Sequence, residues 1–91
     1  QDANTLNQVM ENMTADYKKL LAEDATPLAT FQTHVANGNN VGNNPYFGPY
    51  TLEQNSYITF NAGGNEQAGG DRILKVTISQ GGQKLTSLFT K

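Results

Sequence analysis

The stretch RILKVTISQGGQKLTSLFT, residues 72–90, decides the fold class of this chain. Leu74, Val76 and Ile78 occupy every second position of its first half, which is the period-two pattern of a half-buried strand. Gly81-Gly82 follows, and glycine accepts the positive φ that a two-residue hairpin turn requires. Counting outward from this turn predicts three facing pairs: Ile78 with Leu85, Val76 with Ser87, and Leu74 with Phe89. The C-terminal part of the chain is therefore predicted to be an antiparallel hairpin.

The N-terminal part carries the pattern of an amphipathic helix. Apolar residues recur at steps of three and four and form one stripe: Leu6, Met10, Met13, Tyr17, Leu20 and Leu21, with Val9 at its edge. Asp2 or Asn4 is expected to cap the start of this helix. Because Pro27 disfavours helical geometry at the residue before it, the helix is expected to end near Asp24 or Ala25.

A second, shorter helix is predicted over residues 27–36. Pro27 suits the first position of a helix, Thr26 is expected to cap it, and Asn37-Gly38 is expected to stop it with a left-handed residue. Three apolar residues share one face of this segment: Leu28, Phe31 and Val35. That face predicts that the short helix lies back on the first.

The segments between this helix and the hairpin are predicted from their composition. Residues 37–49, NGNNVGNNPYFGP, form a loop, because glycine and proline break any regular element there. Tyr46 and Phe47 are expected to anchor this loop to the core. Residues 50–60 are rich in Tyr, Thr, Ile and Phe and predict a strand. Residues 61–71, NAGGNEQAGGD, are expected to be a flexible connection.

Length and composition favour one small α+β domain over residues 1–91, with two N-terminal helices packed on an antiparallel sheet. The chain has 91 residues, of which 36% are hydrophobic, so its core is expected to be thin. Eight acidic and six scattered basic residues give a net charge of −2, which argues against a nucleic-acid partner. The absence of cysteine excludes disulfides and thiolate metal sites.

The sequence offers no catalytic pattern, and no enzyme activity is expected. His34 is the only histidine, and no nucleophile-elbow motif accompanies it, so it is interpreted as a helix-surface residue. Asn61, Asn65, Glu66 and Asp71 carry oxygen ligands within one glycine-rich segment, but their spacing does not match a calcium loop. We therefore expect neither a metal nor a cofactor.

The apolar stripe of the first helix suggests a second role beyond the core. A helix of 20 or so residues is about 30 Å long, and short strands lying across it would cover about half of that length. The uncovered residues would then form a subunit interface: Leu6, Val9, Met10 and Met13. The others are expected to lie under the domain's own sheet: Tyr17, Leu20 and Leu21.

Two segments together resemble a known family. The helix opening ANTLNQVMENMTADY and the ending ILKVTISQGGQKLTSLFTK are similar to the type IV pilin superfamily, and above all to minor pilins and type II secretion minor pseudopilins. The residues that carry the helix part are Ala3, Asn4, Leu6, Met10 and Glu11. Those of the hairpin part are Lys75-Val76-Thr77-Ile78, Gly81-Gly82 and the run from Leu85 to Thr90.

The resemblance implies a structural subunit that assembles into a filament through its N-terminal helix. It also implies a membrane-anchored precursor, in which a prepilin cleavage site and about 20 apolar residues precede Gln1 and hold the subunit in the inner membrane. The expected location is the periplasm or the cell surface, and the expected partners are other pilin or pseudopilin subunits. The disulfide loop of many major pilins is absent here, which favours a minor subunit.

A second function remains open from the residues alone. The chain is alternatively a secreted binding module that recognises a sugar or a protein through the loop at 37–50. Tyr46, Tyr50 and Tyr57 are the aromatic residues that would stack on such a ligand.

Overall fold

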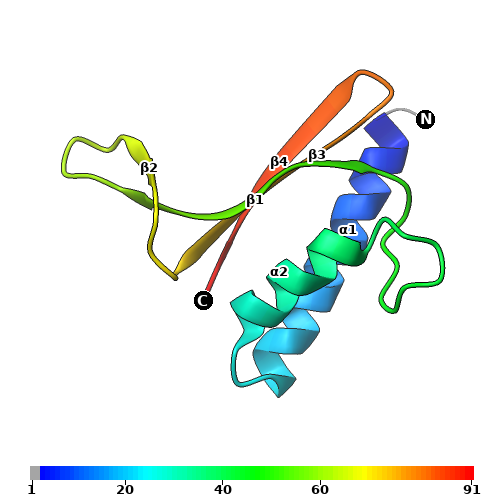
Figure 1. Cartoon of the computed structure of the whole chain (residues 1–91), viewed down its shortest axis with the longest axis horizontal. Helices are drawn as coiled ribbons and strands as arrows, with labels where there is room; N and C mark the ends of the chain where they lie inside the picture. The colour runs from blue at the N-terminus through cyan, green and yellow to red at the C-terminus, as the bar shows by residue number, and fades with distance from the viewer. Residues whose placement is uncertain (1–2) are drawn as a thin grey trace.

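The computed structural model describes residues 3–91, and it contains two helices packed on one face of a four-stranded antiparallel sheet (Figure 1). The helices are α1 (Ala3–Glu23) and α2 (Pro27–Asn37). The strands are β1 (Thr51–Phe60), β2 (Glu66–Ala68), β3 (Ile73–Gln80) and β4 (Gln83–Thr90). Their spatial order is β2-β1-β3-β4, so β2 and β4 are the two edges of the sheet. The predicted α+β fold is confirmed.

The C-terminal hairpin has the predicted register. Ile78 faces Leu85, and the other two predicted pairs are also present. Gly81 and Gly82 have φ values of 59° and 83°, which fit a type I′ turn and explain why glycine occupies both positions. Alternate residues of β3 are buried toward the helices, so the hairpin contributes one apolar face to the core.

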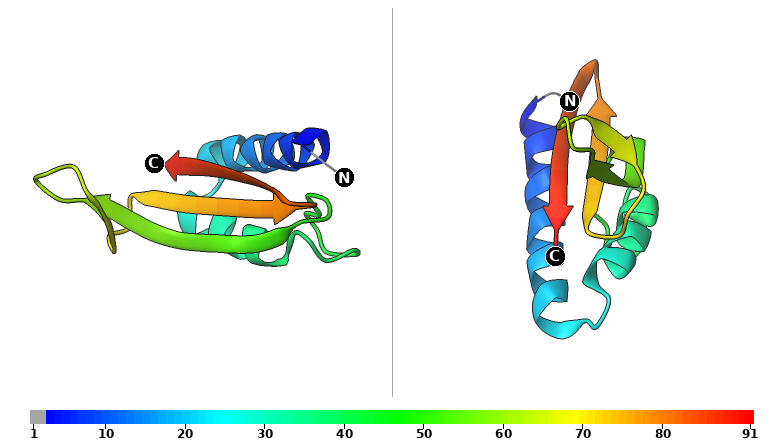
Figure 2. Two further views of the ribbon diagram at one scale, coloured as in Figure 1. Left: turned by 90° about the horizontal axis from the view of Figure 1, so that it is seen from above. Right: turned by 90° about the vertical axis from the view of Figure 1, so that its left-hand side faces the viewer.

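Helix α1 follows the predicted stripe and ends at Glu23, close to the expected boundary. Of the two expected caps, Asn4 lies inside the helix, which already includes Ala3, and Asp2 lies outside the described residues. In Figure 2, α1 runs alongside β4, and its outer flank extends beyond this edge strand. This direction decides which part of the stripe the sheet covers.

The start of α2 differs from the prediction. Thr26 makes no side-chain capping bond, so the expected Thr26 cap is wrong. Asp24 stabilises the turn before α2 instead. Its Oδ1 accepts a 2.7 Å hydrogen bond from the Thr26 backbone N–H, and its Oδ2 accepts a 3.1 Å hydrogen bond from Thr30 Oγ1. The hydrogen bond from the Thr26 backbone is the main cause that lowers the pKa of the Asp24 carboxyl.

The end of α2 also has a different cause from the expected one. Gly38 has a φ of −72°, which is right-handed, so the predicted left-handed stop is wrong. A Cβ at Gly38 would lie 2.8 Å from the backbone carbonyl oxygen of His34 and would collide with the ring of Phe47. Glycine is required here because the loop packs directly on the helix end.

The connection after β1 is more regular than predicted. Residues 66–68 form β2, whose three residues pair with the end of β1 from Ile58 to Phe60. The expectation of a wholly flexible connection over 61–71 is therefore wrong. All three side chains of β2 are exposed, and the ladder to β1 defines the strand. The sequence did not predict this strand because residues 66–68 show no alternation of apolar and polar side chains.

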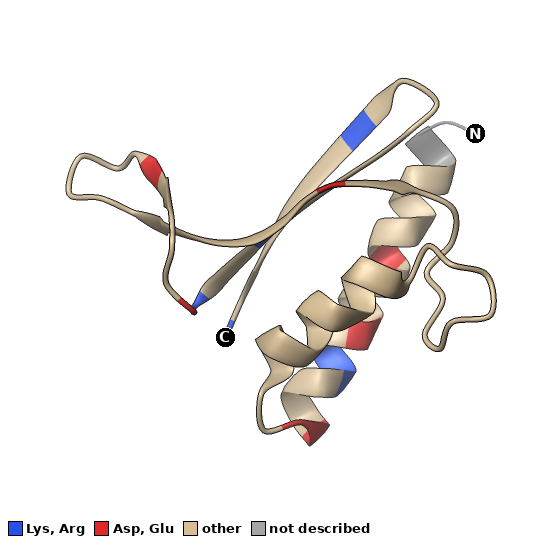
Figure 3. Cartoon of the chain, viewed as in Figure 1, with Lys and Arg blue, Asp and Glu red and all other residues tan. Residues whose placement is uncertain are grey.

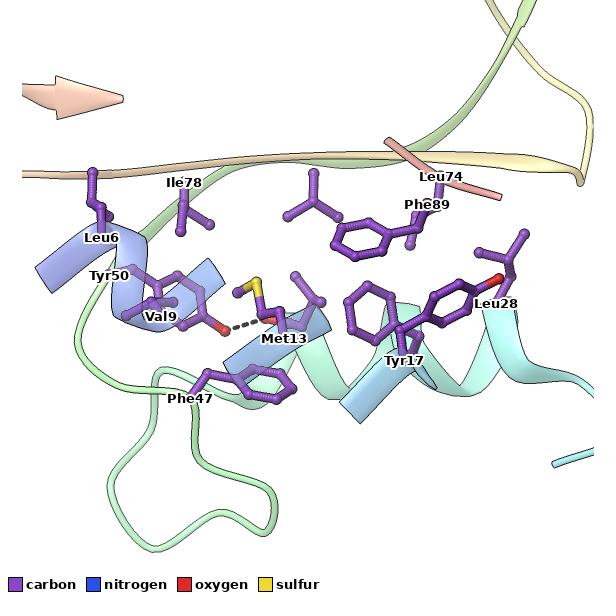
Figure 4. Close-up of a cluster of buried hydrophobic side chains, with 13 residues drawn as sticks. Leu6, Val9, Met13, Tyr17, Leu28, Phe47, Tyr50, Leu74, Ile78 and Phe89 are labelled. Carbon is purple, nitrogen blue, oxygen red and sulfur yellow. Dashed lines mark hydrogen bonds between the residues drawn. The ribbon is translucent and has the colours of Figure 1, made fainter. Parts of the chain in front are cut away.

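Most of the core lies between α1, α2 and the sheet (Figure 4). Its fully buried members include Leu6, Val9, Met13, Leu28, Phe31, Val35, Leu74, Val76 and Ile78. Tyr17, Phe31 and Phe89 add an aromatic cluster, with ring centroids 4.5–5.5 Å apart. Phe47 from the loop is also buried and anchors the loop as predicted, whereas Tyr46 is 41% exposed and does not.

The apolar stripe of α1 is covered over more of its length than predicted. Leu6, Val9 and Met13 are at most 2% exposed, so the expectation that they outrun the sheet is wrong. The physical reason is the direction of the strands, since β4 runs alongside α1 instead of across it, and Figure 4 shows Phe47 and Tyr50 beside the same stripe. Conversely, Leu21 was expected under the sheet and is 47% exposed.

Hydrogen bonds join α2 to β1 and to Tyr50, the residue just before β1. The Tyr50 hydroxyl donates a 2.7 Å bond to the carbonyl of Val35, drawn in Figure 4, and burial raises the pKa of Tyr50 to about 12. Gln32 and Asn55 exchange two bonds of 2.9 and 3.0 Å between α2 and β1. These contacts hold α2 at a fixed position on the sheet.

Candidate interaction surfaces

Two grooves lie on either side of α1. The first, which we call the β4 groove, has a volume of about 530 Å³ and lies between α1 and the edge strand β4. The second, which we call the loop groove, has a volume of about 460 Å³ and lies between α1 and residues 46–49. Helix α1 therefore separates two possible contact surfaces.

The β4 groove combines apolar side chains with the open edge of the sheet. Its floor includes Met10 and Leu85, both partly buried against the core. Its α1 wall also contains Asn7, Glu11, Thr14, Ala15 and Lys18, and its β4 wall contains Thr86 and Ser87. Met10 is the one predicted interface residue that reaches this groove, because Leu6, Val9 and Met13 are covered by their own domain.

The hairpin geometry determines which backbone groups of β4 face the groove. A two-residue turn makes the flanking pair, Gln80 and Gln83, exchange backbone hydrogen bonds, and every second pair along the ladder does the same. The N–H and C=O groups of Lys84, Thr86 and Leu88 therefore point away from β3. Within residues 3–91, β4 pairs with β3 alone, so these edge groups have no strand partner.

The last part of the same edge is closed by α1. The Tyr17 hydroxyl donates a 2.7 Å bond to the carbonyl of Thr90, which is an outward-facing group by the same alternation. The 2.8 Å contact between the Thr77 and Thr86 hydroxyls also fits a pair whose backbone groups face outward, because side chains approach most closely in such pairs. The open part of the edge is thus limited to residues 84–88.

The loop groove is more polar than the β4 groove, and hydrogen bonds among side chains of α1 and from α1 to the loop order one side of it. Asn12 Nδ2 donates a 3.0 Å bond to the carbonyl of Phe47, and Gln8 Nε2 donates a 3.1 Å bond to Asn12 Oδ1. The exposed ring of Tyr46 lies on the loop side of this groove. Tyr50 is buried and Tyr57 does not line the groove, so Tyr46 is the one of the three candidate tyrosines that is available there.

His34 is not a solvated surface residue. Its Nδ1 lies 2.8 Å from Asp16 Oδ2, and the pair joins α2 to α1 with side chains that are 24% and 15% exposed. The hydroxyl of Ser79 instead donates to Glu53, and that of Ser56 accepts from Gln54. The His34–Asp16 pair is a contact between helices, and neither Ser56 nor Ser79 bonds to the imidazole.

The oxygen-bearing residues at 61–71 are used in local structure. Asn61 Oδ1 accepts 2.9 Å bonds from the backbone N–H groups of Gly63 and Asn65, which forms the turn before β2. Both carboxylate oxygens of Glu66 lie 3.0 Å from Lys75 Nζ. Over residues 3–91, no group of three His, Cys, Asp or Glu side chains lies close enough together to hold a metal ion.

The charges are spread over the molecule. Figure 3 shows Lys and Arg on α1, on the hairpin strands and at the C-terminus, separated by acidic residues. Neither helix, over the described residues, has the length and apolarity needed to cross a bilayer. Comparisons with protein-family models, with curated proteins and with solved structures find no match to this chain.

Proposed function

We propose that the chain is a structural subunit, a minor pilin or pseudopilin, of a type IV pilus or a type II secretion pseudopilus. The observation that supports this most is that the two segments with pilin-like sequence form one packed unit. Helix α1 and the β3–β4 hairpin meet through Tyr17, whose ring lies 5.5 Å from that of Phe89 and whose hydroxyl bonds Thr90. These contacts hold the helix in a fixed position on the hairpin, as a subunit that assembles through its N-terminal helix would require.

The proposed assembly surface is the exposed side of α1 rather than its apolar stripe. Met10 and Glu11 lie at the β4 groove and Gln8 and Asn12 at the loop groove, so a neighbouring helix would meet polar residues with Met10 as the apolar contact. In this proposal the head faces the periplasm or the cell surface, and a hydrophobic segment of the precursor anchors it in the inner membrane.

The gene sequence upstream of Gln1 tests the proposal directly. A prepilin leader followed by about 20 apolar residues is the expected result. A cleavable signal peptide immediately before Gln1 would contradict the proposal and would indicate a secreted module.

Crosslinking tests the assembly surface in the full-length protein. Because residues 1–91 contain no cysteine, each variant introduces one reactive thiol into this part of the protein. We expect Glu11→Cys on α1 to crosslink neighbouring subunits in sheared filaments. Ala36→Cys, an exposed position on α2 outside both grooves, is the matched control and should crosslink less. Equal crosslinking of the two variants would remove α1 as the assembly surface.

A second candidate function rests on the loop groove. There the exposed Tyr46 residue lines the same groove as the amide side chains of Gln8 and Asn12, and an aromatic ring together with amide groups suits a sugar ring. Binding of the isolated chain to an oligosaccharide array, lost in Tyr46→Ala and kept in Tyr57→Ala, would favour this function. Absence of any bound glycan would leave the subunit proposal as the better account.

A further inference from the structure

The sheet has two open edges of different kinds. The β4 edge is open over residues 84–88 and adjoins the β4 groove, with α1 extending beyond it on the helix side of the sheet (Figure 2). The β2 edge lies at the end of a projecting segment, residues 59–72, which we call the arm. Every residue of the arm is exposed, and Figure 1 shows it extending away from both helices.

The position of α1 restricts what can pair with β4. If the β4 strands of two copies paired antiparallel with each other, both helix layers would lie on the same side and each α1 would occupy the space under the other's edge. The arm is the part of the molecule that offers a strand edge without a helix beneath it. A strand from the arm therefore fits beside β4 where a complete second domain does not.

The arm also carries an apolar side chain that lacks cover. Phe60 is 47% exposed at the end of β1. The alternation of strand side chains places it on the face of the sheet away from the helices, because the register sets Tyr57 opposite Leu74 on the helix side. When the arm docks with its own helices on the opposite side of the joined sheet, this face meets Met10 and Leu85 in the β4 groove of the next copy. Burying an aromatic ring against such residues is favourable, since apolar area leaves water.

We propose that a second copy of this chain docks its arm along the β4 edge, with β2 adding to the sheet and Phe60 entering the β4 groove. The contact is heterologous, because one copy contributes the arm and the other contributes the edge. The copy that contributes its arm keeps a free β4 edge, and the copy that contributes its edge keeps a free arm, so the association is open-ended. This contact involves the globular part alone and does not depend on the proposed role as a pilus subunit.

Chemical crosslinking of two single-cysteine variants tests the partners in this contact. Gln67→Cys places a thiol on β2, and Thr86→Cys places one at the centre of the open β4 edge. A short bismaleimide is expected to link the two variants when they are mixed, and to link neither variant to itself. Efficient Thr86→Cys homodimers would show that β4 pairs with β4 and would overturn the proposed occupant.

Sedimentation of the purified chain up to millimolar concentration tests the groove. Ala15→Lys fills the β4 groove from an exposed position, and Ala22→Lys is the matched control on the same helix outside it. We expect the wild-type mass to rise with concentration, and the association constant to fall at least about tenfold in Ala15→Lys relative to Ala22→Lys. A chain that stays monomeric at millimolar concentration, or equal association of both variants, overturns the proposal.

The same assay tests the arm side chain. Phe60→Ser removes the apolar contact, and Leu21→Ser removes a leucine with the same exposed fraction, 47%, from the far end of α1. Association should weaken in Phe60→Ser and stay at the wild-type level in Leu21→Ser. If neither substitution changes association, Phe60 does not enter the groove and the proposed contact is wrong.

Discussion

The hydroxyl of Tyr17 donates a 2.7 Å hydrogen bond to the backbone carbonyl of Thr90, which joins two residues that are 73 positions apart in the chain. This bond fastens α1 to the end of the edge strand and satisfies an outward-facing carbonyl. Burial, and to a lesser degree the nearby Tyr57, raises the pKa of Tyr17, so the hydroxyl keeps its proton at neutral pH.

Tyr17→Phe should lower the free energy of unfolding by about 0.5–1.5 kcal/mol, because it removes this hydrogen bond and leaves the ring packing in place. Tyr57→Phe is the control, since the Tyr57 hydroxyl makes no hydrogen bond within residues 3–91. Urea unfolding followed by circular dichroism measures both variants. Equal loss in the two would mean that the bond to Thr90 contributes nothing.

Two leucines of α1 should lose very different amounts of stability on the same substitution. Leu6 is 1% exposed and Leu21 is 47% exposed. Leu6→Ala should lower the free energy of unfolding by about 2–5 kcal/mol, because it leaves a cavity in the core. Leu21→Ala should change it by no more than about 0.5 kcal/mol. Thermal and urea unfolding measure both variants. A Leu6→Ala variant as stable as the wild type would contradict the burial of Leu6 in the core.

Gly38→Ala should destabilise the junction between α2 and the loop. The added Cβ would lie 2.8 Å from the His34 carbonyl oxygen and would collide with the Phe47 ring, so about 1–3 kcal/mol of unfolding free energy should be lost. Gly63→Ala is the control, since its Cβ would lie 3.4 Å from the nearest atom, Asn61 Oδ1. A melting temperature for Gly38→Ala equal to that of Gly63→Ala would show that the loop can move away from the added Cβ without a loss of stability.

Asp24 should give the chain a specific loss of stability in acid. Its pKa is lowered in the folded state from the ordinary value of 3.8, mainly by the bond from the Thr26 backbone. The unfolded chain therefore takes up this proton first, and the contribution of the carboxylate is present above pH 3.8 and is lost as pH falls through the lowered folded-state pKa.

Asp24→Asn measures this contribution. The wild type should be the more stable protein at neutral pH, and the difference in melting temperature between the two should shrink below pH 3.8. A difference that stays constant from neutral to strongly acidic pH would show that the charge of Asp24 has no part in it.

Features of this fold that depend on local interactions are predictable from the sequence, whereas those that depend on distant contacts are not. The register of the β3–β4 hairpin was predictable because Gly81-Gly82 and the alternation at Leu74, Val76 and Ile78 are local signals. The end of α1 followed from Pro27 for the same reason. Asp24 was not recognised as the residue serving the start of α2, because Thr26 occupies the position where a capping side chain is usually found.

The candidate surface was harder to predict because it depends on how distant segments lie. The stripe residues Leu6, Val9 and Met13 look the same in sequence whether strands cross α1 or run along it. Their burial depends on that direction and on the packing of Phe47 and Tyr50. The grooves need the relative positions of α1, β4 and the loop, and no local pattern specifies those. Strand β2 was missed because its exposed residues carry no alternation.

The pairing of the first helix with the last strand also has a consequence for biosynthesis. Ribosomes release the N-terminus first, so α1 leaves the exit tunnel long before the residues of β4 are translated. During that interval Leu6, Val9 and Met13 have none of the hairpin side chains that cover them in the finished fold. The nascent chain therefore exposes the apolar side of α1 to chaperones until the hairpin residues emerge, and the arrival of β4 is the event that buries it.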